Sequence, residues 1–98
     1  MIERYVFVRL KPEYATEAGR AEVRERSQHL ATIPGVLGVA IGAPADDDAA
    51  HAWDLSLVVR FAALADVDAY LDHAAHAAYY EAFLLPRLLV IKAWNFAV

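Results

Sequence analysis

The fold of this 98-residue chain is decided by its middle, residues 36–61, which read VLGVAIGAPADDDAAHAWDLSLVVRF. The segment holds two apolar stretches, 36–41 and 52–61, separated by the loop-like residues 43–50. The second stretch alternates as a strand with one buried face does; its apolar row is Trp53, Leu55, Leu57, Val59 and Phe61. We therefore expect two consecutive strands joined by a flexible loop.

A helix and a strand are expected on the N-terminal side of this pair. Residues 16–32 predict a helix, with Thr16 as its N-cap and Ile33-Pro34-Gly35 as its stop signal. Residues 2–11 predict a strand that ends at Pro12, since proline has no backbone N–H to donate to a neighbouring strand. The faces of that strand are Ile2, Arg4, Val6, Val8 and Leu10 against Glu3, Tyr5, Phe7, Arg9 and Lys11.

A second helix and a last strand are expected on the C-terminal side. Residues 66–85 predict a helical region with a break near His73, and residues 88–96 predict a strand. The order is β-α-β-β-α-β, which is the ferredoxin-like pattern. We therefore expect one α+β domain over residues 1–98, with a four-stranded antiparallel sheet and both helices on one of its faces.

The apolar content of the chain is higher than one small domain needs. Hydrophobic residues make up 59% of the sequence, against an average of about 45–50% in globular domains. The open face of the sheet would carry Val, Leu, Trp or Phe in either register, and bare apolar patches above a few hundred Å² are rare on monomers. We therefore expect a homodimer, sheet against sheet, that forms a dimeric α/β barrel.

Several classes of protein are disfavoured by composition. The chain has no cysteine, which excludes a disulfide framework and a thiolate metal site. No apolar tract approaches the roughly 18 residues of a membrane span, and charges interrupt the N-terminal stretch, so we expect a soluble, cytoplasmic protein without a membrane partner. Residues 31–72 hold seven Asp and one Arg, a net charge of −6 within a total of −4. Nucleic acid is therefore not expected as a partner, and Asp46–Asp48 is expected to be a solvated turn.

One cluster of side chains draws attention as candidate chemistry. Tyr70, His73 and His76 follow one another at three-residue intervals, with Tyr79 and Tyr80 beyond. Imidazole can move a proton near neutral pH, and a phenol can donate a hydrogen bond to a developing oxyanion. Three interpretations stay open: a structural role at a helix junction, acid–base catalysis or recognition of a small ligand, and a metal site, which the two-His spacing alone does not complete.

The helix 16–32 has an unusually thin inward stripe. Its members at helical spacing are Thr16, Gly19, Val23, Ser27 and Leu30, and only Val23 and Leu30 are sizeable. Either large residues on the facing elements fill the space, or a cavity lies beneath the helix.

Four segments carry a resemblance to a known family: IERYVFVRLK (2–11), IPGVLGVAIG (33–42), WDLSLVVRF (53–61) and DAYLDHAAHAAYYEAFLLPRL (68–88). Together they resemble the stress-responsive A/B barrel (Dabb) domain over essentially the whole chain. The Tyr-x-x-His-Pro-x-His segment typical of that family is matched here by Tyr70, His73, Ala74 and His76.

The resemblance implies a dimeric α+β barrel with a cavity between sheet and helices. A plant polyketide cyclase on this scaffold uses a Tyr and a His that match Tyr70 and His76. The pocket histidine common in the first strand of the family is replaced by Arg4, which cannot act as a base and would shift the ligand preference toward a carboxylate.

From these observations we expect a stress-response homodimer with a pocket for a small hydrophobic or carbonyl-containing ligand, no cofactor, no bound metal and no established reaction. The expected ligand-binding residues are Arg4, Phe7, Val23, Ser27, His73 and Tyr79. The alternative is a cofactor-independent polyketide cyclase- or isomerase-like enzyme, with His76 as general base and Tyr70 holding the oxyanion. A cofactor-independent monooxygenase on a similar barrel fits the segment around His73 less well.

Overall fold

A computed structural model describes all residues, 1–98. Its sheet is four-stranded and antiparallel, with the order β2-β3-β1-β4, as the ferredoxin-like pattern predicts. The strands are β1 (Ile2–Leu10), β2 (Gly38–Gly42), β3 (Leu55–Phe61) and β4 (Leu88–Ala97). The α-helices are α1 (Glu17–Gln28), α2 (Asp47–Ala52), α3 (Leu64–Asp72) and α4 (Ala74–Ala77). No helix is long and apolar enough to cross a membrane.

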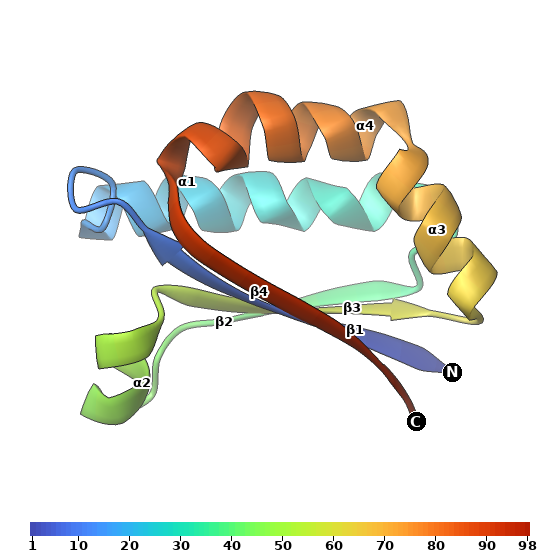
Figure 1. Cartoon of the computed structure of the whole chain (residues 1–98), viewed down its shortest axis with the longest axis horizontal. Coiled ribbons are helices and arrows are strands. Elements are labelled where there is room, and N and C mark those ends of the chain that lie inside the picture. Colours follow the sequence, from blue (N-terminus) through green and yellow to red (C-terminus); the bar gives the residue numbers. More distant parts are fainter.

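The longer helical segments lie on one face of the sheet (Figure 1). In that view α1 runs beside α4 and the helical turns that follow it, and α3 lies at one end of the pair. The short helix α2 projects from the opposite end of the sheet. The two termini lie close together, because the Val98 N–H donates to the Met1 carbonyl at 3.0 Å. The sheet and the helices thus form two layers, with one sheet face left open.

The helix-side face of the sheet carries the core. The alternation expected in β1 and β3 is confirmed for Leu55, Leu57, Val59 and Phe61, which are all buried. Trp53 was expected in the same row, but it precedes β3 and packs against Phe7 on the other face of the sheet. The fully buried core residues of the two strands are Val8, Leu10, Leu55, Leu57, Val59 and Phe61. The other face carries large apolar side chains in the open, with Trp94 52% and Phe96 55% exposed.

Two local features differ from the sequence expectation, one in the connection between β2 and β3 and one in the pairing of β1 with β4. The loop expected at 43–50 contains α2, because the Asp46 side chain caps it by accepting a hydrogen bond from the Ala49 N–H at 2.9 Å. The register of β1 against β4 shifts between Arg9 and Leu10, so Leu88 lies opposite Leu10 rather than in the outer row. Because Leu88, Leu89 and Val90 are all apolar, the sequence shows no change of phase that would reveal this irregularity.

The C-terminal helical region is broken where the sequence predicted a break. His73 has an extended conformation, with φ −69° and ψ 139°, and its Nδ1 accepts from the Ala75 N–H at 3.0 Å. This side chain therefore ends α3 and caps α4. After α4 the chain continues as a π-helix over Ala78–Leu84 and a short 3-10 helix over Leu85–Arg87. π-Helical turns are rare and often lie at functional sites.

The thin stripe of α1 has two separate explanations. A Cβ atom on Gly19 would lie 1.9 Å from the Tyr14 carbonyl oxygen, so the preceding loop requires a glycine there. Ser27 is fully buried, and its Oγ lies 2.6 Å from the Tyr79 hydroxyl in a hydrogen bond. A large residue of the facing helical segment therefore fills the space beneath Ser27.

Candidate functional site

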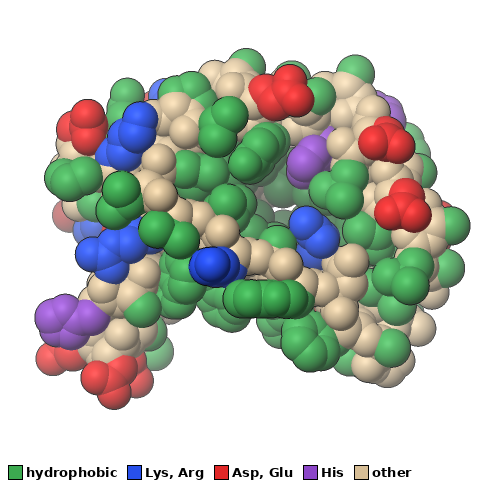
Figure 2. All heavy atoms as spheres, in the orientation of Figure 1, with side chains coloured by type: hydrophobic (Ala, Val, Ile, Leu, Met, Phe, Trp, Pro, Cys, Tyr) green, Lys and Arg blue, Asp and Glu red, His purple; other side chains and the backbone are tan.

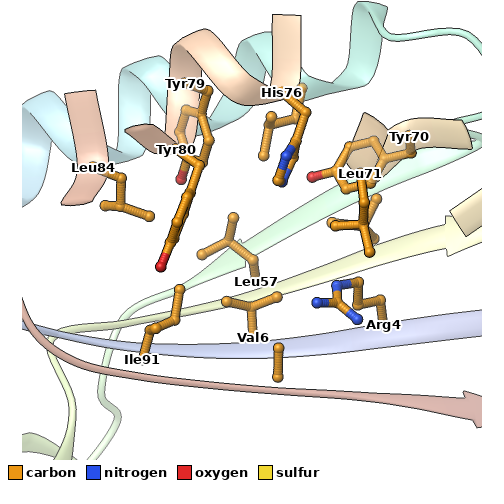
Figure 3. A pocket seen from close by; sticks show the side chains of 13 residues that line it. Arg4, Val6, Leu57, Tyr70, Leu71, His76, Tyr79, Tyr80, Leu84 and Ile91 are labelled. Atoms are coloured by element: carbon orange, nitrogen blue, oxygen red, sulfur yellow. The ribbon is translucent and has the colours of Figure 1, made fainter. Parts of the chain in front are cut away.

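A cavity of about 240 Å³ lies between the sheet and the helical layer. Its walls come from β1, β3 and β4 below and from α3, α4 and the π-helix above (Figure 3). The lining residues are Arg4, Val6, Leu30, Leu57, Val59, Tyr70, Leu71, His76, Tyr79, Tyr80, Leu84, Ile91 and Ala93. The face in Figure 2 is hollowed between the layers, with a histidine and a basic side chain at the rim of the hollow.

Three polar side chains face one another at one end of this cavity. Arg4 comes from β1, Tyr70 from the last turn of α3 and His76 from α4. In Figure 3 the Tyr70 hydroxyl and the His76 ring point toward each other, and the Arg4 guanidinium lies beneath both. The Tyr70 and His76 ring centroids are 4.6 Å apart. Ligand-binding pockets are typically apolar cavities into which a few polar side chains converge, as these three do.

His76 is held in its neutral form. The pKa of His76 is lowered from its ordinary 6.5, mainly by burial and next by the positive charge of Arg4. The backbone of Leu71 and the carboxylate of Glu81 act in the opposite direction and do not reverse the shift. A neutral imidazole has a free ring nitrogen that can accept a proton, which is what a general base needs.

Tyr70 is held in its protonated form and only 3% exposed. Burial raises the pKa of Tyr70 well above its ordinary 10.0, and the nearby Tyr79 acts in the same direction. Its ring packs edge-on against Phe61, with centroids 5.1 Å apart. The chain leaves no fully buried side-chain polar atom without a hydrogen-bond partner. The Tyr70 hydroxyl makes no hydrogen bond within the chain, so it is open to the cavity as a donor.

Arg4 is positioned by a neighbouring strand. One guanidinium nitrogen, Nη1, donates to Oδ1 of Asn95 at 3.0 Å. The two residues are direct partners in the β1–β4 register, so their side chains leave the sheet on the same face. Asn95 therefore aims the guanidinium toward His76 and Tyr70.

The cavity brings together four of the eight predicted site residues: Arg4, Tyr70, His76 and Tyr79. Phe7 is not among them, because it lies on the other face of the sheet against Trp53 and Trp94. Val23 and Ser27 are fully buried in the core. His73 is exposed and serves as the cap of α4. Phe7, Val23, Ser27 and His73 therefore do not line the cavity, contrary to the sequence expectation.

Tyr80 and Asn95 were not among the expected site residues, although the candidate cluster of the sequence included Tyr80. Tyr80 lines the cavity, with its ring stacked on His76 at an interplanar angle of 6°. The π-helix turns both Tyr79 and Tyr80 toward the sheet, whereas regular helical spacing does not place adjacent residues on one face. Asn95 accepts a hydrogen bond from Arg4. Only the register of β1 against β4 identifies Asn95 as the neighbour of Arg4.

A second hollow lies on the open face of the sheet. It is about 490 Å³, and its lining is apolar: Tyr5, Phe7, Trp94, Phe96, Ala97 and Val98. Arg4 and His76 do not reach it, because they belong to the helix side. No group of three or more His, Asp, Glu or Cys side chains is placed to hold a metal ion. Of these two hollows, only the cavity of the helix side is lined by a histidine and an arginine.

The comparisons with known proteins agree with this architecture. A family model described as the Stress responsive A/B Barrel Domain matches residues 2–93. A dimeric ferredoxin-like protein of unknown function from Thermobifida fusca is 28% identical, with a TM-score of 0.82 over 99% of this chain and 90% of that one. No curated protein sequence matches the chain.

Two further structures have the same fold at lower identity. A Dabb family protein with a ferredoxin-like fold from Mesorhizobium loti is 18% identical, with a TM-score of 0.82 over 99% of this chain and 95% of that one. A hydroxynitrile lyase from Passiflora edulis is 15% identical, with a TM-score of 0.83 over 99% of this chain and 92% of that one. At these identities the likeness shows the fold and not the activity.

Proposed function

This chain belongs to the stress responsive A/B barrel (Dabb) domain family, and we propose that it is a homodimer that binds a small carbonyl compound and transfers a proton on it. The observation that carries the proposal is the convergence of Arg4, Tyr70 and His76 on one end of an apolar cavity. The binding of the compound is the first part of the proposal, and the proton transfer is the second.

The homodimer is supported by the open face of the sheet. Trp94 and Phe96 are each more than half exposed there, and an apolar surface of this kind on a sheet is typical of an interface. The similar proteins from Thermobifida fusca and Bacteroides fragilis are both described as dimeric. A two-fold arrangement of sheet against sheet would cover this face and leave each cavity on the outer, helix side.

The size of the cavity limits the ligand. Pockets for drug-sized molecules measure about 300–1,000 Å³, and an apolar cavity of about 150 Å³ holds a benzene ring. At about 240 Å³, the chamber suits one ring with a short substituent or a short branched chain. Eleven of its 13 lining residues are hydrophobic, so most of the ligand is expected to be apolar.

The proposed chemistry is abstraction of a proton from the carbon next to a carbonyl group. The free nitrogen of His76 takes the proton, and the electron pair of the C–H bond moves into an enolate. The Tyr70 O–H and an Arg4 N–H donate hydrogen bonds to the enolate oxygen, where the negative charge develops. Reprotonation of the carbon by the His76 imidazolium completes an isomerisation or an exchange. The same scaffold is compatible with an enzyme, since the protein from Passiflora edulis is named a hydroxynitrile lyase.

Exchange of deuterium into a carbon acid tests this proposal. Acetophenone has one ring, one carbonyl group and one exchangeable methyl group, and mass spectrometry in D₂O follows its deuteration. We expect the protein to accelerate the exchange, His76→Gln to abolish the acceleration and Tyr70→Phe to reduce it about ten- to a thousandfold. His51→Gln, on exposed α2, is the matched control and should keep the wild-type rate.

Two results would overturn the proposal in different ways. If acetophenone binds in the cavity but neither His76→Gln nor Tyr70→Phe changes its exchange, the chain is a binding protein and the proton transfer is wrong. If acetophenone and other small ketones do not bind at all, the ligand class itself is wrong.

A further inference from the structure

Arg4 is a cation without an acidic partner inside the chain. The three ion pairs of the molecule are Arg20 with Asp54, Arg60 with Glu3 and Arg87 with Glu22. Arg4 belongs to none of them, and the amide oxygen of Asn95 is its one side-chain hydrogen-bond partner. A neutral amide orients a guanidinium without balancing its charge.

The surroundings of Arg4 provide no counter-charge either. The cavity wall around it is mostly hydrophobic, His76 is held neutral and Tyr70 is held protonated. Arg4 is only partly buried, so water still reaches its charge, but the apolar wall beside it offers that charge less compensation than open solvent does. An anionic occupant of the cavity would supply the opposite charge that the chain itself does not place beside Arg4.

We infer that the ligand of this cavity carries a carboxylate, which Arg4 binds while the rest of the molecule packs against the apolar wall. The inference rests on the proposed function, because it places the carboxylate in the same cavity as the carbonyl group. The substrate class it names is a small keto acid, aromatic or short-chained. One guanidinium balances one negative charge, which favours a carboxylate over a phosphate dianion.

The geometry of the guanidinium suits this role. It has five N–H donors in a fixed plane, and Asn95 occupies one nitrogen. The guanidinium group lies beneath His76 and Tyr70 in Figure 3, and its other nitrogens make no hydrogen bond to a side chain. Two parallel N–H groups can donate to both oxygens of one carboxylate, an arrangement that a lysine ammonium does not reproduce.

Such a ligand would also change His76. The charged and titratable groups that face this imidazole are Arg4 from β1, Tyr70 from α3, and Tyr79, Tyr80 and Glu81 from its own helical segment. Among them Arg4 lowers the proton affinity of His76 through its positive charge. A carboxylate on Arg4 cancels that effect, so His76 becomes a stronger base when the ligand is bound.

The test compares benzoate with acetophenone, which have similar shapes and differ in charge. Calorimetric titration gives the Kd of each probe, and ¹H–¹³C NMR of the His76 ring gives its pKa with and without benzoate. We expect benzoate to bind the wild type about ten- to hundredfold more tightly than acetophenone, because hydrogen bonds to charged groups are the stronger ones. We also expect the His76 pKa to rise when benzoate is bound.

Variants of Arg4 test whether this residue causes the preference for benzoate over acetophenone. Arg4→Gln should remove the preference for benzoate, and Arg4→Lys should keep part of it because the charge is retained without the planar fork. Arg24→Gln, which removes a cation from α1, is the charge-matched control and should keep the wild-type preference. Thermal melting of each variant shows whether it is folded.

The outcomes separate this inference from the proposed function. Equal affinities for the two probes in the wild type, or a benzoate preference that survives in folded Arg4→Gln, would overturn the carboxylate inference and leave the proton transfer standing. A benzoate preference that depends on Arg4, combined with deuterium exchange that does not depend on His76, would overturn the proton transfer alone. Binding of neither probe would overturn both.

Discussion

Tyr70 and His76 lie with their ring centroids 4.6 Å apart, although six positions separate them in the sequence. In an uninterrupted α-helix two residues at this spacing point about 120° apart. The break at His73, with its extended backbone, turns α4 relative to α3 and brings both rings to the same cavity. The helix break at His73 therefore brings Tyr70 and His76 together. His73 itself is exposed and affects the cavity only by setting the direction of the backbone between α3 and α4.

Stability should depend on pH through His76. Its pKa is lowered in the folded protein and returns to about 6.5 in the unfolded chain. As the pH falls through about 6.5, the unfolded chain therefore takes up a proton that the folded protein does not, and the free energy of unfolding decreases. Urea unfolding at several pH values and one protein concentration measures this loss.

The loss should be smaller in His76→Gln, which has no group to titrate at this position. His51→Gln, on exposed α2, should lose stability as the wild type does. An unchanged acid-side loss in His76→Gln would show that the buried imidazole does not cause it.

The hydrogen bond between Ser27 and Tyr79 should couple the two residues energetically. Ser27→Ala leaves the buried Tyr79 hydroxyl without its partner, which costs about 1–3 kcal/mol of unfolding free energy. Removing that hydroxyl as well, in Ser27→Ala with Tyr79→Phe, should cost less than the sum of the two single variants. Additive losses in urea unfolding would mean that the Tyr79 hydroxyl finds another partner at the cavity.

Gly19→Ala should destabilise the protein, although alanine usually favours a helix by about 1 kcal/mol over glycine. The added Cβ would lie 1.9 Å from the Tyr14 carbonyl oxygen, and overpacking of this kind costs about 1–3 kcal/mol. At Gly38 a Cβ meets no atom within 4 Å, so Gly38→Ala is the matched control. Thermal melting should rank Gly19→Ala below both the wild type and the control.

The open sheet face should be the dimer interface. Trp94→Asp places a charge on this face and is expected to shift the protein from dimer to monomer, measured by light scattering at micromolar concentration. Leu64→Asp changes an equally exposed side chain on α3, away from the face, and should stay dimeric. A monomeric wild type at that concentration would contradict the dimer.

Much of the fold could be predicted from the sequence because the strands alternate strongly. The rows of β1 and β3 follow from a period of two, and the break at His73 also follows from the local pattern. The bulge near Leu10 and the π-helix could not be predicted, since each inserts a single residue that hydrophobic periodicity does not record.

The site was predicted less completely than the fold. Arg4 and Phe7 are an odd number of residues apart in one strand, so alternation already excluded a pocket with both side chains. Val23 and Ser27 were assigned to a pocket because their stripe is thin, and only the position of Tyr79 decides that this space is filled. Asn95 acts through a strand pairing that joins the two ends of the chain.

The position of a bound probe in solution tests directly whether the cavity between sheet and helices is the binding site. Intermolecular NOEs, recorded by isotope-filtered NMR, locate acetophenone on the protein. We predict NOEs from its methyl group to the His76 ring and from its phenyl ring to the methyl groups of Leu57 and Leu84. NOEs to Trp94 and Phe96 instead would place the ligand on the open sheet face and would contradict binding in the cavity of the helix side.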